Sequence, residues 1–116
     1  MAITAGYIDF VIEQLEKVPS VTKRSMFGGV GLYSAGYFFA LMAEDRLYLK
    51  VDDSNRPDFE RAGMEPFRPY NDDRSMQYYE VPVDVLEDAD ELKTWAEKAI
   101  DVSRRVKMRK KPKKRP

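Results

Sequence analysis

The side chains most often used for catalysis near neutral pH are missing from this sequence. It contains no histidine, which removes the commonest proton-transfer group and the commonest metal ligand. It contains no cysteine either, so thiolate metal sites, disulfides and cysteine nucleophiles are excluded. Any reaction would depend on carboxylates, tyrosines and lysines alone. We therefore predict a protein that is not an enzyme, with no catalytic, cofactor-binding or metal-binding residues and no small-molecule substrate.

A cluster of glycines at Gly28, Gly29 and Gly31 is a candidate phosphate-binding loop. Its spacing matches neither G-x-G-x-x-G nor G-x-x-x-x-G-K-[ST], and a strand rather than a helix is expected to follow it. Glycines between strands equally permit a tight turn or a β-bulge. We predict that these three glycines and Gly36 occupy turns, bulges or close-packed backbone positions, and that no cofactor binds beside them.

An acidic segment containing Asp52, Asp53 and Asn55 is a candidate metal loop. It lacks the alternating ligand spacing and the distal glutamate of an EF-hand. Side chains of this kind commonly cap helices, and a short helix that ends at Ala62, before Gly63, is expected to follow. The sequence therefore predicts helix caps and solvated side chains here rather than metal ligands.

The net charge of zero hides two parts of opposite charge. Residues 1–103 hold 11 basic against 20 acidic residues, a net charge of −9, whereas residues 104–116 hold nine basic residues and no acidic one. This asymmetry predicts an acidic folded domain over 1–103 and a basic C-terminal tail over 104–116. The nine candidate nucleic-acid-binding residues are Arg104, Arg105, Lys107, Arg109, Lys110, Lys111, Lys113, Lys114 and Arg115.

Several interpretations of the basic tail remain open. So many adjacent cations can bind any polyanion, including DNA, RNA or an acidic membrane surface. They can also fold back on the acidic body of the protein or serve only to keep it in solution. A nucleic acid would be bound mainly through its phosphates, because the tail lacks the asparagine, glutamine and aromatic side chains that contact bases, although its arginines can contact guanine.

The elements that would carry these residues can be read from hydrophobic spacing. Residues 23–51 predict four short antiparallel strands near 23–28, 30–34, 37–43 and 46–51, of which the first two could be one bent strand. A second strand pair is expected at 65–70 and 76–81, with a turn at 71–74. Pro66 and Pro69 favour a sheet edge for the first of these. The tyrosines of 76–81 occupy consecutive positions, which point to opposite faces of a strand, so the buried face of this segment is undetermined.

Helices are predicted at both ends of the chain. Apolar residues at helical spacing indicate a helix from Thr4, its N-cap, to Val18. The last helix is expected to begin at Asp88, with Glu91 completing a capping box, and nothing breaks it before Pro112. Its apolar stripe contains Leu92, Trp95, Ala96, Ala99, Val102 and Val106.

The predicted fold class is α+β, a two-layer α/β arrangement with a mostly antiparallel sheet in the order α-β(3–4)-α-β(2)-α. At 116 residues the chain is long enough for one core, and both long helices are expected on one face of the sheet. No apolar run approaches the ~20 residues of a membrane span, and no signal peptide is evident. We therefore expect a cytoplasmic protein with no membrane partner. The predicted core contains Val11, Leu15, Phe39, Leu41, Leu49, Phe59, Leu92, Trp95 and Ala99.

Several blocks of the sequence, in order, are similar to one family. They are Met26-Phe27-Gly28-Gly29-x-Gly31-Leu32-Tyr33, Gly36-x-Phe38-Phe39-Ala40-Leu41, Leu47-Tyr48-Leu49-Lys50-Val51, Phe59-x-x-Ala62-Gly63, Pro66-Phe67, Tyr78-Tyr79-Glu80-Val81-Pro82, Leu86-Glu87 and Leu92-x-x-Trp95-Ala96. Over residues 5–103 the chain resembles the TfoX/Sxy N-terminal domain family. That family is known for bacterial regulators of natural competence, which act with the cyclic-AMP receptor protein at competence promoters.

The resemblance implies a two-layer α/β domain with no catalytic residues and no cofactor. It also implies a non-enzymatic role in regulating competence and transcription, with a transcription regulator as a protein partner. Full-length regulators of the family carry a second, helical domain where this chain has its basic tail. The alternative function is a homodimeric protein-interaction module with no nucleic-acid role. A homodimer is expected because Pro66 and Pro69 protect only one edge of the sheet.

Overall fold

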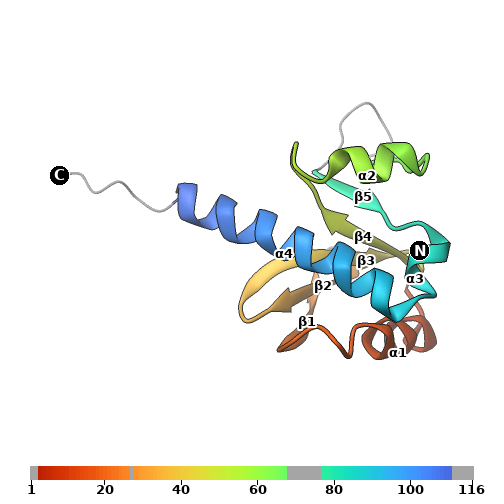
Figure 1. Ribbon diagram of the computed structural model, residues 1–116. Coiled ribbons are helices and arrows are strands. Elements are labelled where there is room, and N and C mark those ends of the chain that lie inside the picture. The colour runs from red at the N-terminus through yellow and green to blue at the C-terminus, as the bar shows by residue number, and fades with distance from the viewer. Residues whose placement is uncertain (1–2, 27, 68–76, 111–116) are drawn as a thin grey trace.

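The computed structural model describes residues 3–26, 28–67 and 77–110, with side chains as far as residue 106. Its helices are α1 (Ala5–Gln14), α2 (Arg56–Arg61), α3 (Val83–Leu86) and α4 (Ala89–Lys110). Its strands are β1 (Val21–Met26), β2 (Gly29–Ser34), β3 (Tyr37–Ala43), β4 (Arg46–Lys50) and β5 (Tyr78–Glu80). The predicted α+β class is confirmed: an N-terminal helix is followed by an antiparallel sheet and a C-terminal helix packed on it (Figure 1).

The sheet is an antiparallel meander in which each strand pairs with the next along the chain, in the order β1-β2-β3-β4-β5. Two-residue loops at Ala35-Gly36 and Glu44-Asp45 close its central hairpins. All four loop residues have positive φ, the conformation that a tight hairpin of matching twist requires. Gly36 therefore lies in a turn, as predicted, and β1 and β2 are two paired strands rather than one bent strand.

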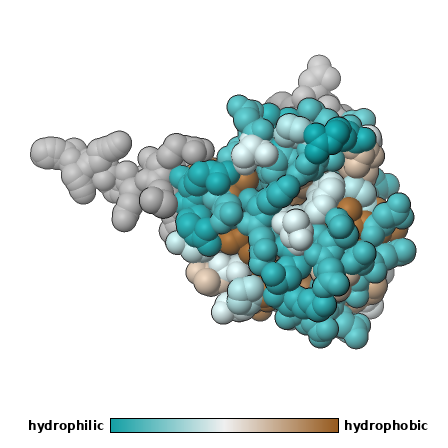
Figure 2. Space-filling model, viewed as in Figure 1, coloured by the Kyte–Doolittle hydropathy of each residue, from teal (hydrophilic) through white to brown (hydrophobic). Residues whose placement is uncertain are grey.

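All four described helices pack on the same face of the sheet. One hydrophobic cluster joins Val11 of α1, Phe59 of α2, Val85 of α3 and Leu92 of α4 to strand residues such as Leu49. Figure 1 shows α4 running across the sheet, with α1 beside its N-terminal end. The outer surface of this helical layer is mostly hydrophilic (Figure 2). The prediction that both long helices cover one face is confirmed.

A β-bulge in β3 decides which of its residues face the helices. The register of the β2–β3 pair jumps at Phe39, which is left without a partner on β2. Phe39 and Ala40 consequently both belong to the helix-side cluster, whereas Leu41 belongs to a second cluster on the opposite face. Leu41 is buried, as predicted, but it does not share a core with Phe39. Of the other predicted core residues, Trp95 is only half-buried against the helix-side cluster.

Helix α1 begins where it was predicted to begin and ends earlier. The side-chain oxygen of Thr4 accepts a hydrogen bond of 3.2 Å from the backbone N–H of Tyr7, which confirms Thr4 as the N-cap. The predicted end at Val18 is wrong, because the regular helix stops at Gln14. A tighter turn follows, in which the N–H of Val18 donates to the carbonyl of Leu15 at 2.9 Å. Leu15 and Val18 are still buried, so the apolar spacing continues beyond the end of the helix.

The second predicted strand pair is present only in part. Strand β5 has three residues, and Pro66 forms an isolated bridge with Tyr79 instead of extending a strand. Two backbone hydrogen bonds flank this bridge: the N–H of Phe67 donates to the carbonyl of Tyr78 at 2.7 Å, and the N–H of Glu80 donates to the carbonyl of Glu65 at 3.1 Å. Pro66 fits between them because its position does not require an N–H directed at β5. The predicted turn at 71–74 lies outside the described residues. The two tyrosines of β5 divide between the faces: Tyr79 packs on the helix-side cluster and Tyr78 on the opposite one.

Helix α4 is capped by Asp88, as predicted. The carboxylate oxygen Oδ1 of Asp88 accepts hydrogen bonds from the backbone N–H groups of Asp90 at 3.1 Å and Glu91 at 3.2 Å. The capping box is not completed, because the N–H of Asp88 donates to the carbonyl of Val85 at 3.1 Å rather than to Glu91. The short helix α3 thus leads directly into α4.

The glycine cluster serves packing, as predicted from its spacing. Gly28 lies between β1 and β2 with φ of +75°, and Gly29 lies against the neighbouring strand. A Cβ atom added at Gly29 would lie 2.3 Å from the backbone carbonyl oxygen of Met42. That contact cannot be relieved by moving a side chain.

We expect Gly29→Ala to lower the free energy of unfolding by about 1–3 kcal/mol, the usual cost of overpacking. Gly6→Ala is the matched control. Gly6 lies in α1 with nothing within 4 Å of an added Cβ, so this change should stabilise the protein by about 0.5–1 kcal/mol. Urea unfolding of both variants measures the two effects. Equal effects of the same sign would contradict the close approach of β2 and β3.

Candidate nucleic-acid interface

The nine cations predicted to bind nucleic acid lie at and beyond the end of α4. The helix continues past residue 103 to Lys110, so the predicted boundary between body and tail falls inside one helix. Figure 1 shows this end of α4 projecting beyond the sheet. Its first part is held by packing, since Val102 and Ser103 are buried and Val106 is half-buried. The expected continuation of the last helix through Val106 is confirmed; Lys111, Lys113, Lys114 and Arg115 lie outside the described residues.

Arg105 contacts the acidic body, although its side chain remains 45% exposed. Its guanidinium Nη2 lies 3.2 Å from Oδ2 of Asp52 and donates a 2.9 Å hydrogen bond to Oγ of Ser54. These partners are more than 50 residues away in sequence, in the loop between β4 and α2. A phosphate would have to displace Asp52 to bind Arg105 fully.

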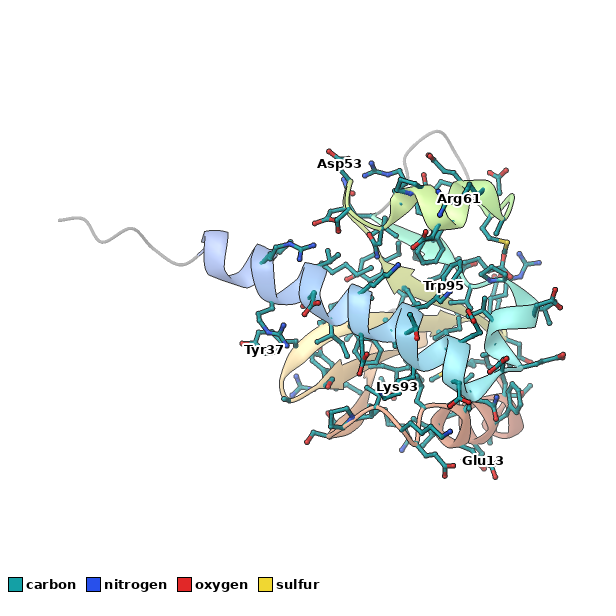
Figure 3. The ribbon with its side chains drawn as sticks, viewed as in Figure 1. Glu13, Tyr37, Asp53, Arg61, Lys93 and Trp95 are labelled. Carbon is teal, nitrogen blue, oxygen red and sulfur yellow. The ribbon has the colours of Figure 1, made fainter. Side chains whose placement is uncertain are left out.

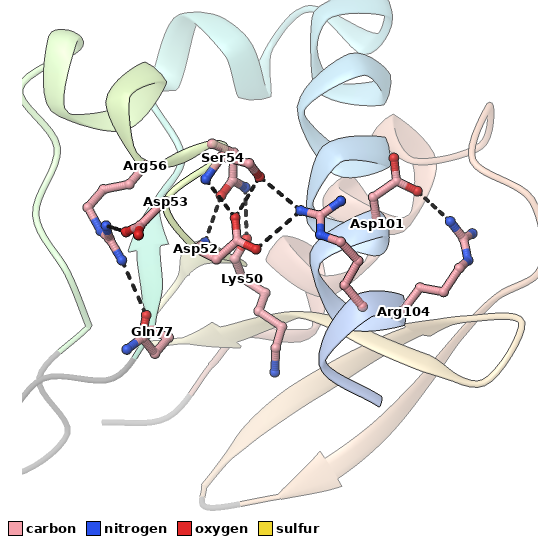
Figure 4. Close-up of polar contacts among 10 residues, drawn as sticks. Lys50, Asp52, Asp53, Ser54, Arg56, Gln77, Asp101 and Arg104 are labelled. Atoms are coloured by element: carbon pink, nitrogen blue, oxygen red, sulfur yellow. Dashed lines mark hydrogen bonds and ion pairs between the residues drawn. The ribbon is translucent and has the colours of Figure 1, made fainter. Parts of the chain in front are cut away.

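The loop that receives Arg105 is ordered by its own hydrogen bonds (Figure 4). Oδ1 of Asp52 accepts from the backbone N–H of Ser54 at 2.8 Å and from its hydroxyl. The side chain of Asn55 is 1% exposed; it accepts from the N–H of Asp52 at 2.8 Å and donates to the carbonyl of Lys50 at 3.0 Å. Asn55 therefore fixes the loop instead of capping α2, where it makes no side-chain cap bond.

Electrostatics favour the ionised form of this pair. Burial raises the pKa of Asp52, but the hydrogen bonds from Ser54 and Arg105 and the positive charge of Arg105 outweigh burial, so this pKa lies below its ordinary value. The contribution of the pair to stability is therefore present at neutral pH and is lost as the pH falls through the lowered pKa. Both side chains are partly exposed, so the pair contributes little energy.

Arg104 is also occupied by the body. It forms an ion pair with Asp101 one turn earlier, and its guanidinium carbon lies 5.4 Å from the centroid of the Tyr37 ring. Figure 3 shows Tyr37 beneath this part of α4. Together with Ser34 and Pro19, these residues line a shallow hollow of about 340 Å³. The first two of the nine cations thus have acidic partners among residues 1–103.

Sequence reasoning missed the ion pair of Arg105. It assigned Asp52, Asp53 and Asn55 to caps and solvation, which fits Asp53 but not the other two. Asp53 forms an ion pair with Arg56, three residues later. The contact between Asp52 and Arg105 depends on where β4 ends relative to α4, and no local pattern encodes that distance.

Another hollow lies between α1, α3 and the β3–β4 turn. Its volume is about 630 Å³, and its lining includes Tyr7, Asp45, Arg46, Glu80 and Val83. Burial raises the pKa of Tyr7 to about 12, and the carboxylates of Asp45 and Glu80 add to the effect. A tyrosine that stays protonated near neutral pH offers hydrogen bonding rather than proton transfer.

The described residues also bear on metal binding and on insertion into a membrane. Among them, no group of three or more aspartates and glutamates is placed to hold a metal ion. None of the described helices combines the length and apolar character that crossing a membrane requires.

Comparison with known proteins gives two matches. The family model of the TfoX N-terminal domain matches residues 13–103. A curated protein of Aliivibrio fischeri, named "DNA transformation protein TfoX1", is 39% identical over 54 residues. That alignment covers 47% of this chain and 26% of the relative, so the chain spans about a quarter of the length of the protein it matches.

Proposed function

This chain belongs to the family of TfoX N-terminal domains, and from that membership we propose that it is a non-enzymatic regulatory domain that contacts nucleic acid through its basic C-terminal arm. We use "arm" for residues 104–116. The family places the protein in the context of DNA transformation, since the matching relative is named for that process. The proposal also includes a transcription-regulating protein as a partner of the folded body.

The observation that carries the nucleic-acid part is the separation of charge in space. The acidic residues belong to the body, with a net charge of −9 over residues 1–103, and the nine cations follow one another along the end of α4 and beyond it. The body as a whole repels a phosphate backbone, so affinity for duplex DNA must come mainly from the arm. The end of α4 projects beyond the sheet (Figure 1), so a duplex that binds this end does not have to meet the whole acidic surface.

The test is the salt dependence of binding to a short random-sequence duplex, followed by fluorescence anisotropy from about 50 to 200 mM salt. If about five of the seven cations beyond Arg105 contact phosphates, log K should fall against log salt with a slope of about −4 to −5. The slope should be the same for unrelated duplex sequences, since phosphate contacts carry no sequence information. A slope near zero, or no binding at the lowest salt, would contradict the role of the arm.

A homodimeric interaction module is the second candidate, favoured by the open edge of β1. This strand ends the strand order, and its residues from Thr22 to Ser25 are exposed. Against the dimer, an antiparallel copy centred on β1 would place Lys23 opposite Arg24 of its partner, and like charges opposed across strands are destabilising. We therefore rank self-association below nucleic-acid binding; light scattering of the whole chain distinguishes the monomer from the dimer.

A further inference from the structure

The face of the sheet opposite the described helices carries a row of aromatic side chains. Strand register places Tyr33 of β2, Phe38 of β3, Tyr48 of β4 and Tyr78 of β5 on this face. The last three belong to one hydrophobic cluster with Leu41. We call this surface the aromatic face and define it by those four rings. The described helices contribute no residue to its cluster. Such a face is unusual in a body whose helix-side surface is mostly hydrophilic (Figure 2).

Two rings of the aromatic face lie at its surface. Tyr33 and Phe38 are stacked, with centroids 5.1 Å apart and planes at 27°, and both are only half-buried. Phe38 also contacts Tyr78, at 5.7 Å between centroids, while Tyr78 itself is 4% exposed. Tyr78 and Tyr48 therefore form the base of the face, and the stacked pair above them is available to an outside partner.

Gly31 allows Phe38 and Met26 to lie close against β2. An added Cβ at this position would lie 3.0 Å from a ring carbon of Phe38 and 2.6 Å from the terminal methyl of Met26. A larger residue would push these side chains outwards. The missing side chain at Gly31 therefore leaves room for Phe38 and Met26 on this face.

Cations outnumber carboxylates on this face of the sheet. Among the strand residues that the register puts on this face, the ionisable groups other than tyrosine are three cations, Arg24, Arg46 and Lys50, and one carboxylate, Glu80. Arg24 is exposed on the edge strand β1, opposite Gly31. The ammonium of Lys50 lies 5.9 Å from the Phe38 centroid and 5.2 Å from that of Tyr78. Nη1 of Arg46 lies 3.5 Å from Oε1 of Glu80, so these two side chains form an ion pair. This local excess of cations contrasts with the net −9 of residues 1–103.

Flat rings flanked by cations match one ligand chemistry in particular. Unpaired bases stack on aromatic side chains with little sequence preference, and their phosphates bind nearby cations. Duplex bases cannot do so, because they are already stacked within the helix. A second copy of this chain would bring its own Arg24 and Lys50 against the same residues, so like charges oppose that occupant.

We propose that the aromatic face binds single-stranded nucleic acid, with bases stacked on Tyr33 and Phe38 and phosphates contacting Arg24 and Lys50. This site is separate from the arm and goes beyond the proposed function, since it distinguishes unpaired strands from duplex. The arm contributes charge to both kinds of complex, whereas the rings contribute only to the first.

The experiment uses the full chain and two probes, oligo-deoxythymidylate and a duplex of equal length. The double variant Tyr33→Leu/Phe38→Leu keeps apolar volume but removes the flat rings. We expect it to weaken single-strand binding at least roughly tenfold and to leave duplex binding unchanged. Tyr7→Leu is the matched control, because Tyr7 is a half-buried tyrosine on the helix side of the sheet. It should change neither affinity.

A surface variant gives a test that does not depend on packing. Arg24→Gln removes one phosphate contact at an exposed site, so the slope of log K against log salt for the single strand should become shallower by about 0.7. Single-strand affinity that is unaffected by both the double variant and Arg24→Gln would overturn the proposal. So would light scattering showing a dimer that the double variant dissociates, because a second copy would then occupy the face. A different result would contradict the proposal that the arm binds duplex DNA: a duplex affinity that does not depend on salt.

Discussion

Replacing the seven cations beyond Arg105 with glutamine is expected to reduce affinity for duplex DNA on the order of 10³-fold or more at about 0.1 M salt. The seven are Lys107, Arg109, Lys110, Lys111, Lys113, Lys114 and Arg115. A binding reaction with a slope of about −4 to −5 gains four to five powers of ten between about 1 M and 0.1 M salt, and this gain disappears with the charges. The melting temperature should stay nearly constant, because the folded core ends before these residues.

The matched control is the double variant Arg104→Gln/Arg105→Gln. It also removes cations from the arm, but these two are paired with Asp101 and Asp52. Duplex affinity should therefore fall by much less per charge than in the seven-residue variant. If both variants lose the same affinity per charge, the body contacts of Arg104 and Arg105 do not restrict them. If the seven-residue variant binds DNA as tightly as the parent chain, the arm has no role in binding.

Replacing Phe59 with alanine is expected to lower the free energy of unfolding by about 3–5 kcal/mol, the range for truncating a buried aromatic residue. Phe59 is 1% exposed and connects α2 to the rest of the core. Its ring lies edge-on to Trp95, with centroids 4.8 Å apart, and 5.8 Å from Tyr79. Figure 3 shows Trp95 on the side of α4 that faces α2. Phe59→Ala would therefore remove the ring contacts that join α2 to both α4 and β5.

Two further variants set the scale for this measurement. Val83→Ala should cost less than about 0.5 kcal/mol, because Val83 is 61% exposed. Trp95→Ala should fall between the two, since Trp95 is half-buried and not, as the sequence predicted, a fully buried member of the stripe. Urea unfolding of Phe59→Ala, Trp95→Ala and Val83→Ala measures the order of their losses in unfolding free energy. A cost for Phe59→Ala no larger than that for Val83→Ala would show that α2 is not packed on the core.

The parts of the fold that follow from local patterns were predictable. The two-residue loops at Ala35-Gly36 and Glu44-Asp45 stand between apolar runs, and Thr4 and Asp88 precede helical spacing, so turns and caps could be placed directly. The errors arise where tertiary contacts override such patterns. Apolar spacing continues through Val18 although α1 has ended, because a tight turn also buries Leu15 and Val18.

The candidate sites were harder to predict than the fold. The list of nine cations treated all of them alike, and only the folded chain shows that Arg105 meets Asp52 across more than 50 residues. The aromatic face depends on the bulge at Phe39, which assigns Phe38 and Leu41 to one side and Phe39 to the other. A one-residue irregularity of this kind leaves no clear trace in hydrophobic alternation.

The meander order of the sheet has a consequence for the folding kinetics of the chain. Every strand from β1 to β4 pairs with a neighbour joined by a short loop, so most pairing closes over small sequence separations. Low contact order of this kind favours rapid formation of the sheet. The helix-side cluster is different, because Leu92, Ala96 and Ala99 of α4 complete it from the far end of the chain. During synthesis the apolar face of the strands therefore stays uncovered until α4 has been made. In this interval the protein is most exposed to aggregation or most in need of a chaperone.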